Sequence, residues 1–396
     1  MFDVVRRELA KTTADRIVAI VWVGLLVGLL ANSALNGSYI ADSHGRPVPG
    51  DFLAFWSAGQ LFAEGHAAAA YDPEILRHIQ AQDIGHPIAD YYPWVYPPLF
   101  LFVAILLAQF PYAVAYVLWA IATLIGYGAC AKALFRDRDA ALAFGAAPAC
   151  FGAFIIAQNG LFTAALFGAA LLTLTKRPIL SGLLLAALAY KPQFGVLFPI
   201  ALIAGGHWRM ILVATLATAA WMLVWLVIDK AVFSGFVNAL AFASHNYLAV
   251  GMGGWHKLQS IYGLLLTLGM GEGWASTVHG IIAACCIVVV AVAWRSPMSF
   301  SMKSAIIALC SLIVTPYSYI YDFPILTIAV GFLYRDRPFD RVEQLAVWSA
   351  YALVAAYLFT GIPLGTAAVA LIAMLVARRI PRSQWRPYPG AVDRGE

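Results

Sequence analysis

Long stretches of uncharged apolar residues recur along almost the whole chain, and they constrain its fold more than any other feature. Only 11% of the 396 residues are charged and 62% are hydrophobic, whereas a soluble domain has roughly 25% charged residues. So few charges cannot cover a water-facing surface, which excludes a soluble enzyme, a disordered chain and a nucleic-acid-binding protein. The sequence therefore predicts an all-α integral membrane protein that crosses the bilayer many times.

The apolar segments differ in length, and several are shorter than the roughly 20 residues that a perpendicular membrane-spanning helix needs. Short segments are typical of helices that break around a buried polar cavity. If 97–110 and 112–134 both crossed the bilayer, every later loop would lie on the wrong side, so we expect one of them to be partial. This leaves about twelve crossings. The segments are 17–34, 97–110, 112–134, 140–157, 161–175, 179–190, 194–205, 209–228, 275–294, 303–316, 323–334, 342–358 and 363–377.

Lysine and arginine indicate which connections face the cytoplasm, because cytoplasmic loops carry an excess of both. The rule places both termini inside and the segment 35–96 outside, where seven acidic residues accompany two basic ones. The predicted cytoplasmic cations are Arg6, Arg7, Lys11, Arg16, Arg136, Arg138, Lys176, Arg177, Arg209, Arg295, those of the 335–341 loop, and those of the tail from Arg378.

This sidedness gives one membrane domain, 1–396, whose unusual polar residues gather on its outer face. A site at the outer membrane boundary follows. The predicted parts are a first span (17–34), an outer loop (35–96), core helices (97–228), a second outer loop (229–274), C-terminal helices (275–378) and a cytoplasmic tail (379–396).

The first outer loop predicts two short helices. Residues 52–64 carry aromatic side chains at helical spacing and are followed by Gly65 as a stop signal. Such an amphipathic helix would lie in the membrane interface. Asp72 and Pro73 predict the N-cap and first position of the second helix. Asp51 precedes the first helix, and two roles fit it: a helix cap, or a carboxylate that takes a proton as general base.

Six motifs along the chain, none specific alone, form a more specific set in their order. In that order they resemble glycosyltransferase family 87, the bacterial mannosyltransferases that depend on polyprenol-phosphate-mannose, over about residues 15–380. The motifs are "GDFLAFWSAGQLFAEGHAAAAYDP", "YPPLF", "AQNG", "YKPQFGVLFP", "WHKLQSIYGLL" and "TPYSYIYDFP".

The resemblance implies a GT-C fold in the bacterial inner membrane, with juxtamembrane helices in the first outer loop and an active site that faces the periplasm. It also implies inverting transfer of a hexose, mannose in these relatives, from a polyprenyl-phosphate sugar to a lipid or glycan acceptor. The base of the family is an aspartate in the first outer loop, and Asp51 is the matching position. Tyr317 stands where other members place a histidine, while Asp322 matches, so position 317 does not support the role of that histidine or the specificity for mannose.

Transfer from such a donor needs a base for the acceptor hydroxyl, cations or amides for the departing lipid phosphate, and hydrogen bonds to the sugar. The sugar carbon passes through an oxocarbenium-like state. The leaving group is already an ionised phosphodiester, so no divalent metal is required if protein cations are in place, and no cofactor is expected.

Lys191 is the strongest candidate to bind the donor phosphate, because it interrupts an apolar run and ionisable residues at membrane depth are costly. The alternative is a lysine that snorkels to water. Lys257 and His256 are further phosphate candidates. The candidates for sugar or acceptor binding are Gln193, Gln158, Asn159, Asp322, Trp255, His245 and Tyr317.

Several of these residues have structural alternatives. Trp255 has the commoner role of an interfacial anchor, and a lone histidine such as His245 is more often structural. Asp322 fits a cap of the helix beginning at Phe323 as well as it fits a group that orients sugar hydroxyls or a cationic partner.

Two other function classes compete with the enzyme. A transporter or lipid flippase is the main alternative, although we find no internal repeat and the polar residues lie at outer turns rather than at the bilayer midplane. A non-catalytic scaffold for envelope assembly is the third.

Overall fold

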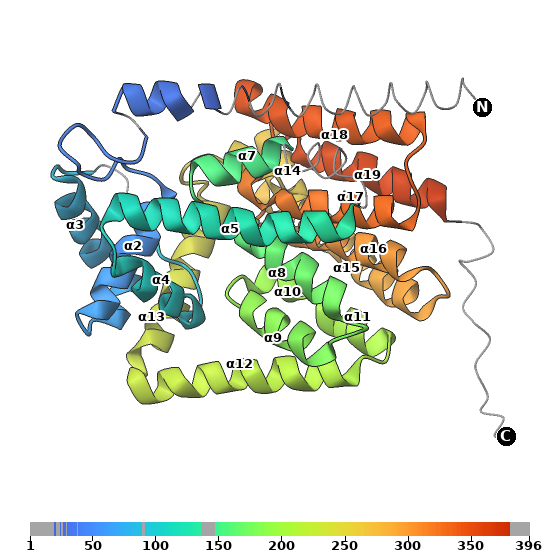
Figure 1. Cartoon of the computed structure of the whole chain (residues 1–396), viewed down its shortest axis with the longest axis horizontal. Coiled ribbons are helices and arrows are strands. Elements are labelled where there is room, and N and C mark those ends of the chain that lie inside the picture. The colour runs from blue at the N-terminus through green and yellow to red at the C-terminus, as the bar shows by residue number, and fades with distance from the viewer. Residues whose placement is uncertain are drawn as a thin grey trace.

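The structure is a computed structural model that describes residues 30–37, 39–88, 92–135 and 147–380, with four residues between 20 and 28. Every regular element in these ranges is helical, which confirms the all-α prediction (Figure 1). The predicted first span, the N-terminal arm, Arg136, Arg138 and the tail beyond Ile380 lie wholly or largely outside the described residues, so those predictions stay predictions.

The helices begin and end close to the predicted apolar segments. The segment 194–205 is divided in two, as α10 and α11, and only part of 140–157 is described. The helices are α5 (Tyr112–Leu134), α7 (Pro148–Ile155), α8 (Gly160–Thr173), α9 (Pro178–Leu188), α10 (Pro192–Gly195), α11 (Phe198–Ala204), α12 (Trp208–Ile228), α15 (Glu272–Arg295), α16 (Phe300–Val314), α17 (Pro324–Asp336), α18 (Arg341–Thr360) and α19 (Gly365–Arg379).

Prolines set several of these boundaries. Pro148, Pro178, Pro192 and Pro324 are the first residues of α7, α9, α10 and α17. Proline fits there because the first helical N–H has no partner within the helix, and its ring stops a preceding helix from continuing. Prolines therefore set the starts of four short helices in a chain that stays largely apolar.

Three helices in the described part of the chain, α5, α12 and α15, are long and apolar enough to cross a membrane by themselves. Figure 1 shows α5 and α12 lying nearly parallel along the long axis of the molecule. In contrast, α4 (Leu101–Ala108) has eight residues, about 12 Å of helix, against a hydrocarbon core of roughly 30 Å. This agrees with a partial segment at 97–110, and the total of about twelve crossings stays a prediction.

The segment predicted as the first outer loop folds into the two predicted helices, α2 (Asp51–Ala63) and α3 (Pro73–Ile84), joined by the 3-10 turn η1 (Ala67–Tyr71). These helices lie at one end of the molecule, at the left in Figure 1. The Asp72 carboxylate accepts hydrogen bonds from the backbone N–H of Glu74 and Ile75, at 2.9 and 3.1 Å. Asp72 is therefore the N-cap of α3, as predicted.

The aromatic face of α2 does not meet lipid as we expected but packs against protein. Phe52 and Phe55 are fully buried, and their rings make edge-to-face contacts with Tyr112, Tyr116 and Phe100. Aromatic pairs favour this geometry. The helix is anchored in the bundle by its aromatic side chains, so its first turn is held in a fixed place.

Glycine permits the closest approach in this region. A Cβ atom at Gly59 of α2 would lie 2.1 Å from the carbonyl oxygen of Ala104 in α4. The two helices therefore touch backbone to backbone, which only glycine allows.

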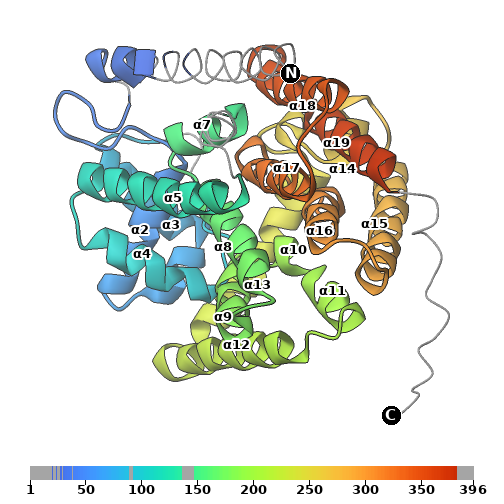
Figure 2. The same cartoon turned by 45° about the vertical axis from the view of Figure 1, so that its right-hand side comes forward.

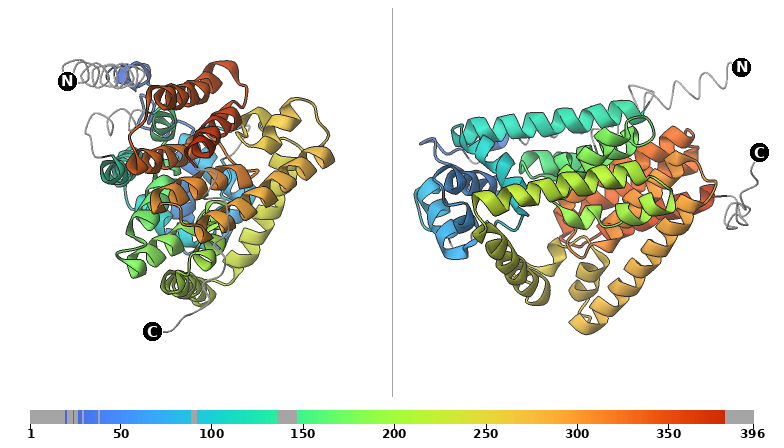
Figure 3. Two further views of the ribbon diagram at one scale, coloured as in Figure 1. Left: turned by 90° about the vertical axis from the view of Figure 1, so that its right-hand side faces the viewer. Right: turned by 90° about the horizontal axis from the view of Figure 1, so that it is seen from below.

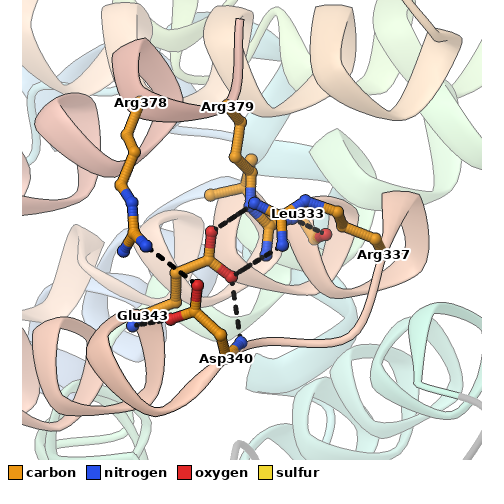
Figure 4. A network of polar contacts seen from close by, with 6 residues as sticks. All are labelled: Leu333, Arg337, Asp340, Glu343, Arg378 and Arg379. Carbon is orange, nitrogen blue, oxygen red and sulfur yellow. Dashed lines mark hydrogen bonds and ion pairs between the residues drawn. The ribbon is translucent and has the colours of Figure 1, made fainter.

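A buried ion network ties α18 to α19 (Figure 4). Glu343, in the first turn of α18, receives hydrogen bonds from the guanidinium of Arg379 at 2.7 and 2.9 Å and from Arg337 at 2.7 Å. The Glu343 carboxylate also accepts the N–H of Asp340, which caps the helix in return. Arg378 pairs with Asp340 at the exposed edge of the network.

Two of the three ion pairs of this network, one buried and one exposed, predict different losses of stability when they are broken. Glu343→Gln leaves the Arg379 charge buried without its partner, so we expect a loss of stability on the order of 3 kcal/mol. Arg378→Gln removes the exposed pair and should cost less than about 1 kcal/mol. Thermal unfolding of the purified variants in detergent measures both, and equal melting temperatures would contradict this account of the network.

Candidate active site

Four segments meet at one place in the molecule. They are the start of α2, the α7–α8 turn, the α9–α10 turn and the 3-10 turn η5 (Ile320–Asp322). The contacts between them are direct. The Gln158 amide donates to the Asp51 carboxylate, and the Lys191 ammonium donates to that of Asp322. Predicted site residues from four distant parts of the chain thus lie together.

Asp51 is the first residue of α2 and is half-buried. The N-cap is Gly50 and no side chain caps the helix, so the capping alternative for Asp51 is wrong. The Gln158 amide nitrogen donates to one carboxylate oxygen at 3.2 Å. Burial raises the pKa of Asp51, while Gln158, Lys257 and Lys191 act in the opposite direction. A raised pKa makes this carboxylate a stronger base than an exposed aspartate.

Gln158 and Asn159 form the buried turn that orients Asp51. The side-chain oxygen of Gln158 accepts the N–H of Asn159 at 2.8 Å and the hydroxyl of Tyr96 at 3.4 Å. These two bonds assign the amide oxygen, so the amide nitrogen faces Asp51. Asn159 is completely buried beside the same hydroxyl.

Lys191 and Asp322 form a buried ion pair with a nitrogen–oxygen distance of 2.6 Å. Their exposed fractions are 5% and 1%, so the snorkelling alternative for Lys191 is wrong. Asp322 also accepts the N–H of Tyr319 at 3.0 Å. It does not cap α17, whose N-cap Phe323 has no side-chain partner. Of its predicted roles, pairing with a cation is the one the structure displays.

The segment predicted as the second outer loop, residues 229–274, forms backbone contacts with the start of η5. Leu258 forms an antiparallel bridge with Tyr319, and the N–H of Gln259 donates to the carbonyl of Ser318 at 2.6 Å. Lys257, the last residue of the 3-10 turn η4 (Trp255–Lys257), lies just before this bridge and lowers the pKa of Asp51 through its charge. Lys257 is exposed, and no ion pair to a described residue neutralises it.

The remaining predicted residues lie around this centre. Trp255 is half-buried and donates its indole N–H to the carbonyl of Leu248 at 2.9 Å. Tyr317 donates its hydroxyl to the carbonyl of Ala243 at 2.6 Å, which ties η5 to α13 (Ala231–Ala243). Within the described residues, no hydrogen bond or ion pair joins Asp51 to the exposed His245, the exposed His256 or the half-buried Gln193.

Sequence reasoning missed the buried aromatic residues beneath the site. The ring of Tyr190 stacks on that of Phe100, with centroids 4.5 Å apart, and its hydroxyl lies 2.6 Å from that of Thr163. Tyr96 bonds Gln158 through its own hydroxyl. A signal for both tyrosines existed, because each begins one of the motifs, "YPPLF" and "YKPQFGVLFP".

The described residues include no group of three or more histidine, cysteine, aspartate or glutamate side chains that could hold a metal ion. The expectation that the reaction requires no divalent metal stays a prediction.

The fold and the site define a class: a membrane protein whose apolar helices hold a half-buried carboxylate, a buried lysine–aspartate pair and an exposed lysine where the helices end. The sequence profile of glycosyltransferase family 87 matches residues 94–316. The match covers more than half of the chain, so the chain belongs to glycosyltransferase family 87 and is a glycosyltransferase. No curated protein and no solved structure matches it.

The extent of the match separates the site residues into two groups. It includes the α7–α8 turn, Lys191 and Lys257, and it ends before Tyr317 without reaching back to Asp51. It is thus shorter than the span 15–380 over which the motifs indicate a resemblance. Family membership favours the enzyme over the transporter and the scaffold.

Gly160 yields a test of how the site is held together. A Cβ atom there would lie 1.5 Å from the carbonyl oxygen of Tyr321, so Gly160→Ala must displace η5 and with it Asp322. We expect a loss of stability of roughly 1–3 kcal/mol together with loss of sugar transfer. Gly128→Ala in α5 is the control, since nothing lies within 4 Å of its Cβ position. Thermal unfolding and a transfer assay measure both, and a fully active Gly160→Ala enzyme would refute this packing.

Proposed function

We propose that this enzyme is an inverting hexosyltransferase of the bacterial inner membrane. It moves a sugar from a polyprenyl-phosphate donor to a hydroxyl of a lipid-linked or envelope glycan acceptor on the periplasmic face, with Asp51 as the general base. The observation that carries the proposal is the placement of Asp51, whose carboxylate is half-buried, held by Gln158 and raised in pKa by its surroundings.

The reaction needs one proton acceptor and one displaced phosphate. Asp51 takes the proton of the acceptor hydroxyl, and the hydroxyl oxygen forms a bond to the anomeric carbon of the sugar. The bond between that carbon and the donor phosphate oxygen breaks, and its electron pair leaves with the polyprenyl phosphate. Attack opposite the leaving group inverts the anomeric configuration.

The two lysines of the site take different parts in this scheme. Lys257 is exposed and unneutralised within the described structure, so it is the better ligand for the departing phosphate, with His256 beside it. The charge of Lys191 is balanced by Asp322 at 2.6 Å. We therefore propose that the main role of Lys191 and Asp322 is to position η5. A direct contact between Lys191 and the donor phosphate would be a secondary role.

The sugar and acceptor contacts follow from the same arrangement. Gln158 orients the Asp51 carboxylate, and Asn159 lies beside Gln158. Trp255, Gln193 and His245 remain candidates for contacts to the sugar or acceptor. Tyr317 is better explained as a positioning residue, because its hydroxyl is bonded to the carbonyl of Ala243. Mannose is the first donor sugar to test.

Asp51→Asn tests the base. The amide keeps the shape but cannot accept the proton, so we expect transfer from polyprenyl-phosphate mannose to an envelope lipid extract to fall by about 10²–10⁴-fold. Asp72→Asn is the matched control in the same outer segment, because asparagine caps a helix as well as aspartate does. Radiolabel transfer in membranes with equal protein levels is the measurement. Full activity of Asp51→Asn would remove Asp51 as the base.

Lys257→Gln tests both the phosphate contact and the charge on Asp51. Lys257 lowers the pKa of Asp51, so its removal raises that pKa further and moves the acidic limb of the kcat/KM profile to higher pH. The donor KM should rise at the same time. Lys230→Gln, an exposed lysine elsewhere, is the control. An unshifted acidic limb would show that Lys257 does not act on the base.

A further inference from the structure

A basic groove lies at the other end of α9 from the active site. Its volume is about 660 Å³, and it is open to the surroundings of the protein. Helix α9 runs from this groove to the Lys191 turn over eleven residues, about 16 Å. The groove is lined by Lys176, Arg177, Pro178, Ile179, Leu180, Leu183 and Arg209.

The charge of the groove is entirely positive. Its lining contains three cationic side chains and no acidic one. Lys176, Arg177 and Arg209 are all exposed, and none takes part in an ion pair with a described residue. Three unneutralised cations around one cavity attract an anion.

The backbone adds to the positive electrostatic potential of the groove. Helices α9 and α12 both begin at the groove, and neither has a side-chain cap at its N-terminus. They lie side by side (Figure 2), because Gly182 brings them so close that a Cβ atom there would lie 2.7 Å from the Cβ of Val213. Two uncapped helix N-termini present free N–H groups and partial positive charge to the same place.

The walls of the groove are apolar and face outward. Ile179 is 63% exposed and Leu183 is 49% exposed. The most apolar window of α12 is only 6% buried within the protein, and Figure 3 shows this yellow-green helix at the edge of the bundle. A helix so apolar and so exposed contacts lipid chains, so the cations lie where a lipid headgroup meets its acyl chains.

We infer that this groove binds the headgroup of an anionic phospholipid. The phosphate lies between Lys176, Arg177 and Arg209, and the acyl chains follow the exposed faces of α9 and α12. A soluble anion would use the cations but not the apolar walls, whereas a phospholipid uses both. The inference concerns a site apart from Asp51 and does not depend on the identity of the sugar donor.

The test compares lipid retention by three forms of the full-length protein. Each is reconstituted in nanodiscs of phosphatidylcholine with a minor fraction of phosphatidylglycerol, and native mass spectrometry counts the bound lipids after release. The groove variant carries Lys176→Gln, Arg177→Gln and Arg209→Gln. The control variant loses the same charge at exposed positions elsewhere, through Lys132→Gln, Arg295→Gln and Arg341→Gln.

We expect the wild type and the control variant to retain phosphatidylglycerol over phosphatidylcholine, and the groove variant to lose that preference several-fold. Leu183→Gln keeps every charge but makes the groove wall that contacts the acyl chains more polar, so it should weaken the retention of phosphatidylglycerol. Inorganic phosphate added in excess should not displace the lipid. Equal loss in both triple variants, no preference in the wild type, or displacement by inorganic phosphate would overturn the inference.

Discussion

The buried ion pair between Lys191 and Asp322 is the interaction on which the arrangement of the site depends. The two residues are 131 positions apart in the sequence and belong to the α9–α10 turn and to η5. Removing two charges from water is costly, and the attraction between them offsets that cost only in good geometry. The 2.6 Å contact therefore favours this relative placement of the two turns, because separating them leaves a charge buried without its partner.

The other parts of the site are fixed by reference to this pair. Gly160 lets the α7–α8 turn approach the backbone of Tyr321 in η5, and this places Gln158 where its amide meets Asp51. On the other side of η5, the bridge between Leu258 and Tyr319 brings η4, with its exposed lysine, toward the same carboxylate. The Asp51 carboxylate and the Lys257 cation are thus positioned by backbone contacts with one short turn.

The sequence predicts the helices well and the contacts between them poorly. The apolar runs predicted most of the boundaries, and the prolines that the structure shows at four helix starts act just as locally, within one turn of helix. Lys191 and Asp322 each stood out as polar residues beside apolar runs, but nothing local indicated that they pair. Asp51 was placed correctly at the start of α2, yet its capping alternative failed because Gly50 takes the N-cap position. The prediction that the aromatic face of α2 lies in the membrane interface was wrong for a related reason. A periodic pattern shows that a face is buried but not whether lipid or protein covers it.

The two ends of α9 show why the apolar helices of this enzyme carry their charges so unequally. At the active-site end, Lys191 is neutralised by Asp322, and a buried charge there is tolerated only because it is paired. At the opposite end, Lys176 and Arg177 have no carboxylate partner in the described structure and remain exposed. Unpaired cations are tolerated there because they are exposed, and the positive-inside rule predicts a cytoplasmic position for them. The same short helix therefore connects a charge-balanced end, whose buried lysine is paired, to an exposed end whose cations remain available to an anionic ligand.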